Sequence, residues 1–443
     1  MNANKIKILY EKVPRSIKFM LTPFFIKKMV DNRIFIETIK EVQRFESLQQ
    51  EERQILQLNK MKDLLIYSYE NIPFYKQRFD DANFDPYSFS DFEQMNQIPL
   101  LEKADAIAAG DTIYSTDSKL DYYETFTGGS SGQALRLLLD QESIYKERAY
   151  VCNFLMKHGY DLRKTRTVAF WGHNKTDDYY YSPLKNEIVI SPFRLFKEEE
   201  LEGICRDIEK FGAEFIAGYP SAIYTFARLL NKAGRKMRFK EAVFYAENFS
   251  EDERVYIEKT FKCESCSYYG HTERAVFAEL EKGQWVFQDS YGFTELVSTE
   301  NQGESRIVCT GFLNKKMPLI RYATDDVIEV DEQGKCKLVG HKRSDVYLVA
   351  KNGAPIFKGA MTLHLAELSD ITRYQYYQTE PGKALLRLMS NQPLSTAEKN
   401  KVLSYLKRRT EGLLDIEIVQ VDNIELTARG KERWAIVELD NKD

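Results

Sequence analysis

The sequence predicts an α/β protein with a large multi-layer N-terminal domain and a small α+β C-terminal domain. Up to about residue 340, short apolar segments of strand-like composition alternate with segments of helical periodicity. This alternation indicates parallel strands joined by helices. At 443 residues the chain is also longer than one ordinary hydrophobic core, so more than one domain is expected.

The individual elements follow from local patterns. Apolar residues at helical spacing predict helices within 36–70, and Pro73 marks a helix boundary. Further along, strands are expected at 166–172, 214–220 and 241–247, and helices at 198–212 and 221–234.

The character of the sequence changes near 340–345. Residues 347–357 are typical of a strand, an Asn-Gly turn and a second strand. Ser395 and Glu398 form a capping-box pattern ahead of a helix, and 415–421 alternates like a strand. We therefore expect three segments: a basic helical arm, a large domain and a C-terminal domain, at 1–60, 61–342 and 343–443.

Composition excludes several classes of protein. A net charge of −4 gives no general attraction to nucleic acid, and no N-terminal signal peptide is evident. The six cysteines lack disulfide-like spacing, which suggests a reducing compartment. Cys263 and Cys266 form a Cys-x-x-Cys pair, but without a second pair we expect free thiols rather than a zinc site. The protein is expected in the cytoplasm.

The first 28 residues are unusually basic. Seven basic residues face one acid, Glu11; they are Lys5, Lys7, Lys12, Arg15, Lys18, Lys27 and Lys28. With the apolar residues between them, they could lie on the anionic inner face of a membrane. The alternative, a helical arm packed on the first domain with its lysines solvated, is preferred because surface segments often have this composition.

A glycine-rich segment, TFTGGSSGQAL (125–135), follows a strand-like stretch. Glycines let backbone N–H groups approach an anion, and hydroxyl groups add donors, so such loops can cradle phosphates. A Gly/Ser run alone is more often a plain loop, and this one is no Walker loop because no Gly-Lys-Ser/Thr follows. The role of this segment therefore has to be judged together with the motifs that follow it in the sequence.

The order of the later motifs resembles the adenylate-forming superfamily, in its phenylacetate–CoA ligase-like branch with the CapK-type proteins of capsular-polysaccharide clusters. The segments NIPFYKQRF and IPLLEK also look like the N-terminal part of that branch. After the glycine-rich loop come GYPSAI (218–223), YYGHTER (268–274), GFTELV (292–297), MPLIRYATDD (317–326), HKRSD (341–345) and LTARGKERW (426–434).

Two of these motifs repeat Tyr-Gly-x-Thr-Glu. By resemblance, the first copy ends a strand of the nucleotide site, and the second is structural. Glu295 of the second copy stands in an alternating apolar run, whereas Glu273 of the first stands at a polar turn. The first copy is therefore expected to carry the chemistry.

The resemblance implies ATP-dependent formation of an acyl-AMP with release of pyrophosphate, followed by acyl transfer. The acceptor would be a thiol such as coenzyme A or an amine, and the work could belong to surface-polysaccharide biosynthesis. On this view 61–342 is the ATP- and acyl-binding adenylation domain, and 343–443 is a mobile domain. The expected partners are a small carboxylic acid and its acceptor.

The resemblance also implies roles for residues. The phosphate loop would be Thr127, Gly128, Gly129, Ser130, Ser131 and Gly132, and Tyr269 and Gly270 belong to the nucleotide motif. Thr272 would contact the α-phosphate and Glu273 would hold Mg²⁺, which prefers oxygen ligands. Asp326 would bind the ribose hydroxyls.

The C-terminal part would contribute two more residues. Lys431 would bridge the substrate carboxylate and the α-phosphate, and Arg343 belongs to the hinge between domains. Walls of the acid pocket are expected at Trp171, His173 and Tyr219, and His271 could face the substrate. Strand-end packing is an equally good interpretation of Trp171, His173 and Tyr219.

Two departures from the family pattern keep other functions open. Gln133 stands where the family loop usually continues towards a lysine, and Asp325 adds a negative charge near the nucleotide. A non-catalytic homologue that binds a nucleotide or a partner is the first alternative. A membrane-associated scaffold is the second, and it depends only on residues 1–28.

Overall fold

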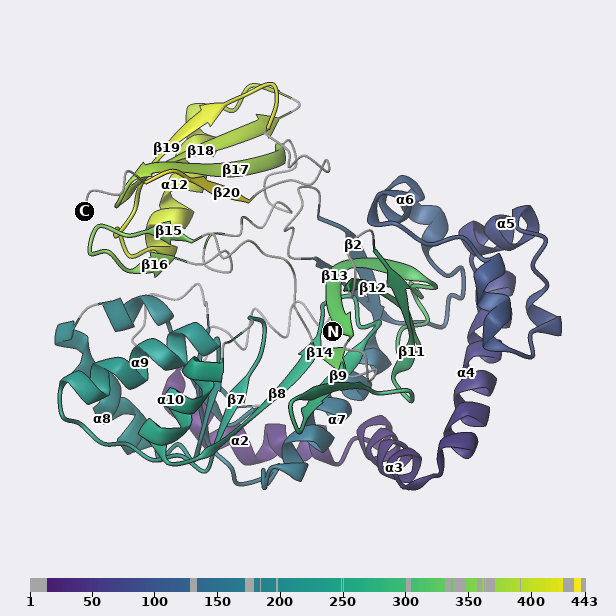
Figure 1. Ribbon diagram of the computed structural model, residues 1–443, viewed down its shortest axis with the longest axis horizontal. Helices are drawn as coiled ribbons and strands as arrows, with labels where there is room; N and C mark the ends of the chain where they lie inside the picture. Colours follow the sequence, from purple (N-terminus) through teal and green to yellow (C-terminus); the bar gives the residue numbers. More distant parts are fainter. Residues whose placement is uncertain are drawn as a thin grey trace.

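An eight-stranded sheet forms the centre of the computed structural model, in the order β10-β9-β8-β7-β6-β3-β5-β4 (Figure 1). Its strands are β3 Thr167–Phe170, β4 Tyr180–Ser182, β5 Glu187–Ile190, β6 Phe215–Gly218, β7 Glu241–Phe244, β8 Glu264–Gly270, β9 Phe277–Glu281 and β10 Gln284–Phe287. The structure describes residues 14–127, 134–171, 179–183, 185–196, 198–247, 249, 251–299, 304–330, 336–337, 347–356, 361, 363, 371–390, 392–424 and 434–439.

The middle of this sheet is parallel. Strands β5, β3, β6, β7 and β8 pair in parallel, and β4, β9 and β10 add antiparallel edges. The three strands expected between 166 and 247 are β3, β6 and β7, which confirms the predicted α/β class. Their residues are buried throughout, as in sheets covered on both faces.

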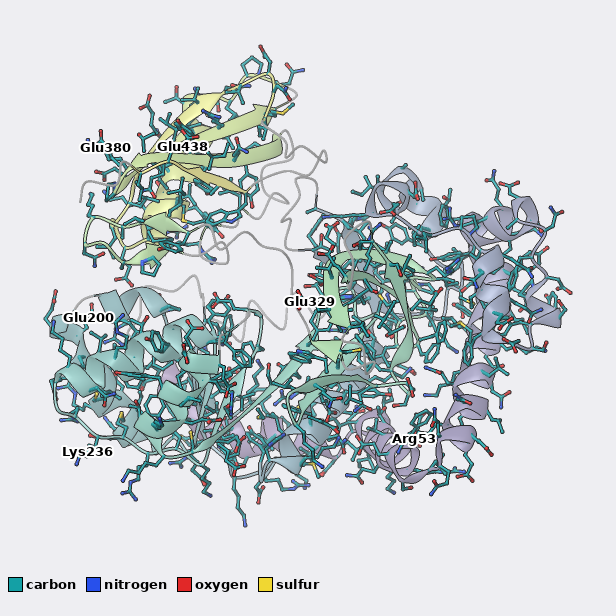
Figure 2. The ribbon with its side chains drawn as sticks, in the orientation of Figure 1. Arg53, Glu200, Lys236, Glu329, Glu380 and Glu438 are labelled. Atoms are coloured by element: carbon teal, nitrogen blue, oxygen red, sulfur yellow. The ribbon has the colours of Figure 1, made fainter. Side chains whose placement is uncertain are left out.

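Helices cover the two faces of the sheet. On one face Val168 and Phe170 pack with α8 (Leu201–Phe211), α9 (Pro220–Lys232) and α10 (Glu251–Phe261). On the other, Ala169 packs with α7 (Gln141–Lys157). In Figure 2 side chains fill the space between these layers, and the exposed Lys236 lies at the margin of the helical layer.

N-terminal helices join the central sheet to a second sheet. The helical periodicity of 36–70 resolves into α3 (Arg33–Ser47) and α4 (Gln50–Asn71), and Pro73 begins α5 (Pro73–Asp81). The boundary expected after residue 60 lies inside α4. Helices α4, α5 and α6 (Lys103–Ala108) pack on the pair β1 (Tyr122–Phe126) and β2 (Arg136–Asp140) and on the sheet β11-β12-β13-β14. The strands of that sheet are Gly292–Ser298, Glu304–Gly311, Tyr322–Val330 and Cys336–Lys337.

The N-terminal arm forms helix α2 (Arg15–Val30), which lies against the edge of the central sheet. The Phe19 ring stacks on Tyr181 of β4 at 3.9 Å between centroids. Lys18, expected to be solvated, is instead 5% exposed and lies over the Tyr180 ring. Among the described residues, no helix is long and apolar enough to cross a membrane.

The C-terminal residues form a hydrophobic core of their own, drawn from residues between 348 and 437. Its four-stranded sheet has the order β19-β18-β17-β20, formed by Asp415–Gln420, Lys383–Ser390, Ile371–Glu380 and Ala435–Val437. The hairpin β15 (Leu348–Val349) and β16 (Pro355–Ile356) and the capping box of α12 (Thr396–Arg409) confirm the sequence prediction. The expected domain boundary at 343 lies outside the described residues.

Candidate active site

Four neighbouring parallel strands carry an aromatic residue at the same level. Three of these residues directly follow β3, β6 and β7, and the fourth lies within β8. Phe170 pairs with Gly218, Gly218 with Phe244, and Phe244 with Ser267. The residues that follow these four are Trp171, Tyr219, Tyr245 and Tyr268, all of them partly exposed. Ligands of α/β sheets bind at the carboxyl ends of the strands, so this row marks the candidate site.

Gly218 allows β6 to end so close to β3. Its φ is +130°, and an added Cβ would lie 2.1 Å from the carbonyl oxygen of Phe170. The Tyr219 amide donates a hydrogen bond of 3.0 Å to that same oxygen. Any other residue would push Tyr219 and the start of α9 away from the strand ends.

The first Tyr-Gly-x-Thr-Glu copy forms the last residues of β8 and the turn that follows. Thr272 is exposed, whereas the side chains of His271 and Glu273 are 15% and 14% exposed. His271 Nδ1 lies 3.1 Å from Glu273 Oε2.

The two side chains of this turn hold each other charged. Burial disfavours the charged imidazole, but the Glu273 carboxylate outweighs it, and the pKa of His271 lies well above its usual value. Burial alone would raise the pKa of Glu273, yet the imidazolium lowers it below its usual value. An ionised carboxylate is thus available at the turn.

Arg274 fastens this turn to the rest of the site. Its guanidinium donates hydrogen bonds of 2.8 Å to Ser143 Oγ in α7 and of 2.6 Å to the Tyr123 hydroxyl in β1. Strand β1 leads into the glycine-rich loop, whose base is closed by Thr127: its Oγ1 accepts a 3.0 Å bond from the amide of Leu135. Arg274 therefore ties the turn after β8 to β1, the strand that leads into the glycine-rich loop.

The second Tyr-Gly-x-Thr-Glu copy lies against the turn formed by the first copy. It forms β11, where a Cβ on Gly292 would lie 2.8 Å from the carbonyl oxygen of Ala275, directly after the first turn. Glu295 accepts hydrogen bonds from Arg321 at 3.1 and 2.7 Å, and the pair is 14% and 8% exposed. The copy predicted to be structural thus forms a strand with a buried ion pair.

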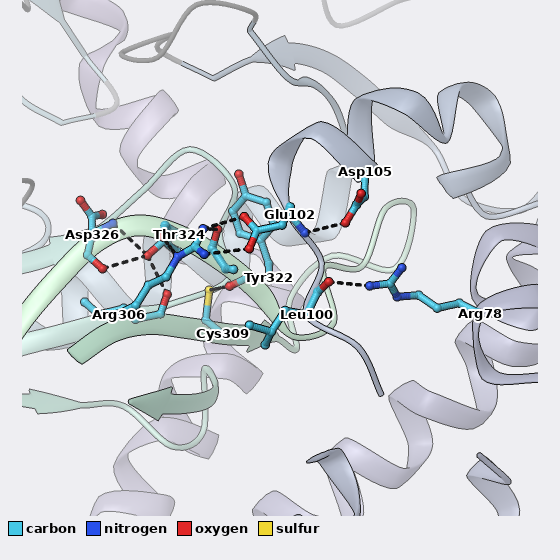
Figure 3. A network of polar contacts seen from close by, with 11 residues as sticks. Arg78, Leu100, Glu102, Asp105, Arg306, Cys309, Tyr322, Thr324 and Asp326 are labelled. Carbon is cyan, nitrogen blue, oxygen red and sulfur yellow. Dashed lines mark hydrogen bonds and ion pairs between the residues drawn. The ribbon is translucent and has the colours of Figure 1, made fainter. Parts of the chain in front are cut away.

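Asp326 joins the second sheet to the first copy. It is buried in β13, and the Tyr269 hydroxyl donates a 2.5 Å hydrogen bond to its Oδ2. Beside it, Arg306 donates to both oxygens of Glu102 and to the carbonyl oxygen of Thr324, each at 2.7 Å (Figure 3). The neighbouring Asp325 is exposed.

Comparisons with known proteins agree with this arrangement, although no family model matches. The chain is 24% identical to protein CapK of Staphylococcus aureus over 98% of both chains. It is 23% identical to phenylacetate–coenzyme A ligase of Thermus thermophilus over 64% of this chain and 66% of that one. The chain is therefore similar to adenylate-forming proteins of the phenylacetate–CoA ligase-like type.

Solved structures show the same fold. A 2-hydroxyisobutyryl-CoA ligase in complex with 2-HIB-AMP and CoA in the thioesterification state superposes with a TM-score of 0.56 at 15% identity, covering 90% of this chain and 92% of that one. The same ligase in the postadenylation state, in complex with 2-HIB-AMP, gives a TM-score of 0.53 at 16% identity and covers 89% and 91%.

Several residues expected from the family motifs lie outside the described residues: Gly128, Gly129, Ser130, Ser131, Gly132, His173, Arg343 and Lys431. The described ones come together in two groups. Thr272, Glu273 and His271 share the turn with Tyr269 and Gly270, and Asp326 is bonded to Tyr269. Trp171 and Tyr219 belong to the aromatic row, while Thr127 stands at the base of the loop.

Sequence reasoning missed Arg148 of α7, which lies near Tyr268 of the aromatic row. Its Nε is buried and forms no hydrogen bond with any described residue. Burial opposes its charge, but Cys152, Tyr160, Glu187 and Tyr268 around it raise the pKa, so the guanidinium is charged. Within the helical segment 141–157 an arginine looks like any solvated helix charge, so no sequence signal could have found it.

The Cys-x-x-Cys pair forms no metal site. Cys266 belongs to the cluster under α7, whereas Cys263 packs against the cluster under α10, so the two thiols lie on opposite faces of the sheet. Cys266 instead groups with His158 and Glu241, with ligand atoms within 4.8 Å of one another. Glu241 begins β7, so this group lies at the opposite end of the strands from the candidate site.

Proposed function

We propose that this protein activates a carboxylic acid with ATP, forms an acyl-AMP with release of pyrophosphate, and transfers the acyl group to a thiol or an amine. The observation that carries the proposal is the turn after β8, where an exposed Thr272 and an ionised Glu273 stand at the carboxyl end of a parallel sheet. The related ligase that binds both 2-HIB-AMP and CoA favours coenzyme A as acceptor. An amine acceptor in polysaccharide assembly is the second candidate, and the likeness to CapK motivates it.

The protein contributes alignment and charge in this reaction. The loop Thr127–Gly132 would hold the β- and γ-phosphates, Thr272 the α-phosphate and Asp326 the ribose. The donors at the turn fit Mg²⁺, because Glu273 is ionised although partly buried, and the bound cation would neutralise phosphate charge. Lys431 would join the carboxylate to the α-phosphate, and Arg343 would act at the hinge.

Pyrophosphate release across a panel of carboxylic acids tests the proposal. Release with at least one acid, dependent on ATP and the acid, is the expected result. ATP binding in calorimetry without AMP from any acid and acceptor would instead support a non-catalytic homologue, the alternative that Gln133 and Asp325 suggest. If the protein neither binds ATP nor releases pyrophosphate, both the catalytic proposal and its non-catalytic alternative are wrong.

Glu273→Ala is expected to slow acyl-AMP formation about 100-fold or more, because it removes a charged contact that the transition state needs. The measurement is single-turnover formation of acyl-AMP as Mg²⁺ is varied. Glu281→Ala, at an exposed carboxylate of β9, serves as the control. Equal Mg²⁺ dependence in Glu273→Ala and the wild type would show that Glu273 holds no cation.

Tyr269→Phe is expected to weaken ATP binding about 10-fold, since it removes a hydrogen bond to a charged group and frees the Asp326 carboxylate to turn. Calorimetry with ATP measures the change. Tyr268→Phe is the matched control, because Tyr268 packs in the cluster under α7 rather than on Asp326, and its loss of a hydroxyl should leave ATP affinity unchanged. If the two variants bind ATP with equal affinity, Asp326 does not hold the nucleotide.

We also infer that the aromatic row and Arg148 wall the pocket for the acid. A charged guanidinium deep in a protein is costly unless it meets an acceptor, and Trp171 Nε1 is a second buried donor without a bond to any described residue. Arg148→Met is therefore expected to lower kcat/KM about 10- to 100-fold for acids with a second acceptor group, and little for apolar acids. Lys146→Met, in the same helix, is the control; equal losses for both kinds of acid would contradict the inference.

A further inference from the structure

Helix α2 has two different faces. One face is buried against the edge of the central sheet through Lys18, Thr22, Ile26 and Met29, which are 5%, 7%, 3% and 8% exposed. Thr22 Oγ1 lies 2.6 Å from the Tyr181 hydroxyl, within hydrogen-bond distance. These residues recur at helical spacing, so a single face of the helix fixes it to the protein.

The opposite face is apolar and exposed. Ile17, Met20, Leu21 and Phe24 are 45%, 80%, 39% and 63% exposed. Their spacing of three, one and three residues places them side by side on a helix, and we call them the α2 stripe. Single exposed apolar residues are ordinary on a protein surface, but adjacent ones on one face mark an interaction surface.

Positive charge accompanies the stripe. Lys27 and Lys28 are exposed in the last turn of α2, and the helix contains no acidic residue from Arg15 to Val30. The next acid, Asp31, is paired with Arg163 at 2.7 Å. This local charge stands out in a chain whose net charge is −4.

We propose that the α2 stripe docks on the surface of an anionic lipid bilayer, with Lys27 and Lys28 among the headgroups. An apolar face and a basic cluster together give stable membrane attachment where either alone is marginal. Because α2 cannot cross the bilayer, it would lie in the plane of the interface. The complementary charge favours anionic lipid over a neutral surface. This proposal does not rest on the proposed reaction.

Flotation of the purified full-length chain with vesicles tests this docking. The wild type should float with phosphatidylcholine vesicles that contain phosphatidylglycerol, and remain behind with pure phosphatidylcholine. The double substitution Lys27→Gln/Lys28→Gln should lower the partition coefficient about 30-fold, since each cation near an anionic surface contributes about a fivefold step. Met20→Glu/Phe24→Glu should abolish flotation at unchanged melting temperature, because both side chains are exposed.

Ile55→Glu is the matched control, since Ile55 is 59% exposed on α4 and belongs to no such stripe. It should float like the wild type. Equal flotation of wild type and both α2 variants would overturn the proposal. A lower mass of the Met20→Glu/Phe24→Glu variant in light scattering, without flotation of the wild type, would overturn it too, because the stripe would then be an interface between protein chains.

Discussion

Lys431→Ala is expected to slow acyl-AMP formation about a hundred- to a thousand-fold and to leave acyl transfer from pre-formed acyl-AMP nearly unchanged. The resemblance to adenylate-forming proteins implies that this lysine would reach the carboxylate and the α-phosphate only during adenylation. Removing one charge-assisted contact to a transferring phosphate costs about 3–4 kcal/mol, which gives that factor in rate. Single-turnover assays of the two half-reactions measure the two effects separately.

Lys407→Ala provides the control for this half-reaction test. Lys407 is an exposed lysine of α12, in the same C-terminal part of the chain, and its loss should change neither half-reaction. If Lys431→Ala adenylates at the wild-type rate, the assignment of the C-terminal motif is wrong. If both half-reactions fall equally, Lys431 supports the fold or both states of the domain rather than adenylation alone.

The fold was predictable where local pattern and tertiary environment agree. Strands buried on both faces, such as β3 and β6, read as continuous apolar runs. The Ser395 capping box forms within four residues, so its geometry does not depend on the rest of the chain. The Lys18 side chain shows the limit: its burial over Tyr180 depends on a strand far away in the sequence.

The candidate site was predictable only at its motifs. The ordered motifs placed Thr272 and Glu273 at a turn, because Gly and polar residues end strands locally. The aromatic row needed the pairing register of four strands, and nothing in the sequence around Tyr245 indicates which strands flank it. Contacts such as Arg306 with Glu102 likewise join residues from different sheets and helices.

Glycines show the same division between local and tertiary causes. Gly292 looked like part of a repeated motif, yet a Cβ there would lie 2.6 Å from the carbonyl oxygen of Thr310 in β12 and 2.8 Å from that of Ala275, so its requirement comes from two backbone neighbours. A sequence pattern can indicate that a residue without a side chain stands there, but not which neighbour excludes the Cβ. The two copies of the motif are thus in contact, and the second helps to hold the turn of the first.

Glu295→Ala is expected to lower the free energy of unfolding by about 3–5 kcal/mol, the cost of leaving one charge of a buried ion pair without its partner. Arg321 donates to both Glu295 oxygens, and its Nη1 also donates a 2.5 Å bond to the carbonyl oxygen of Ile98. The guanidinium therefore cannot turn away to water. Urea unfolding measures the loss, and the fraction of protein still folded should adenylate normally.

The comparison with the other copy makes this test decisive, because Glu273→Ala should cost activity while Glu295→Ala costs stability. Glu273 lies at a turn beside an exposed Thr272, whereas Glu295 lies in β11 and forms an ion pair with the buried Arg321. The double variant Glu295→Ala/Arg321→Met removes both charges and should recover part of the lost stability. A Glu295→Ala protein as stable as the wild type would show that the ion pair is not what the second copy contributes.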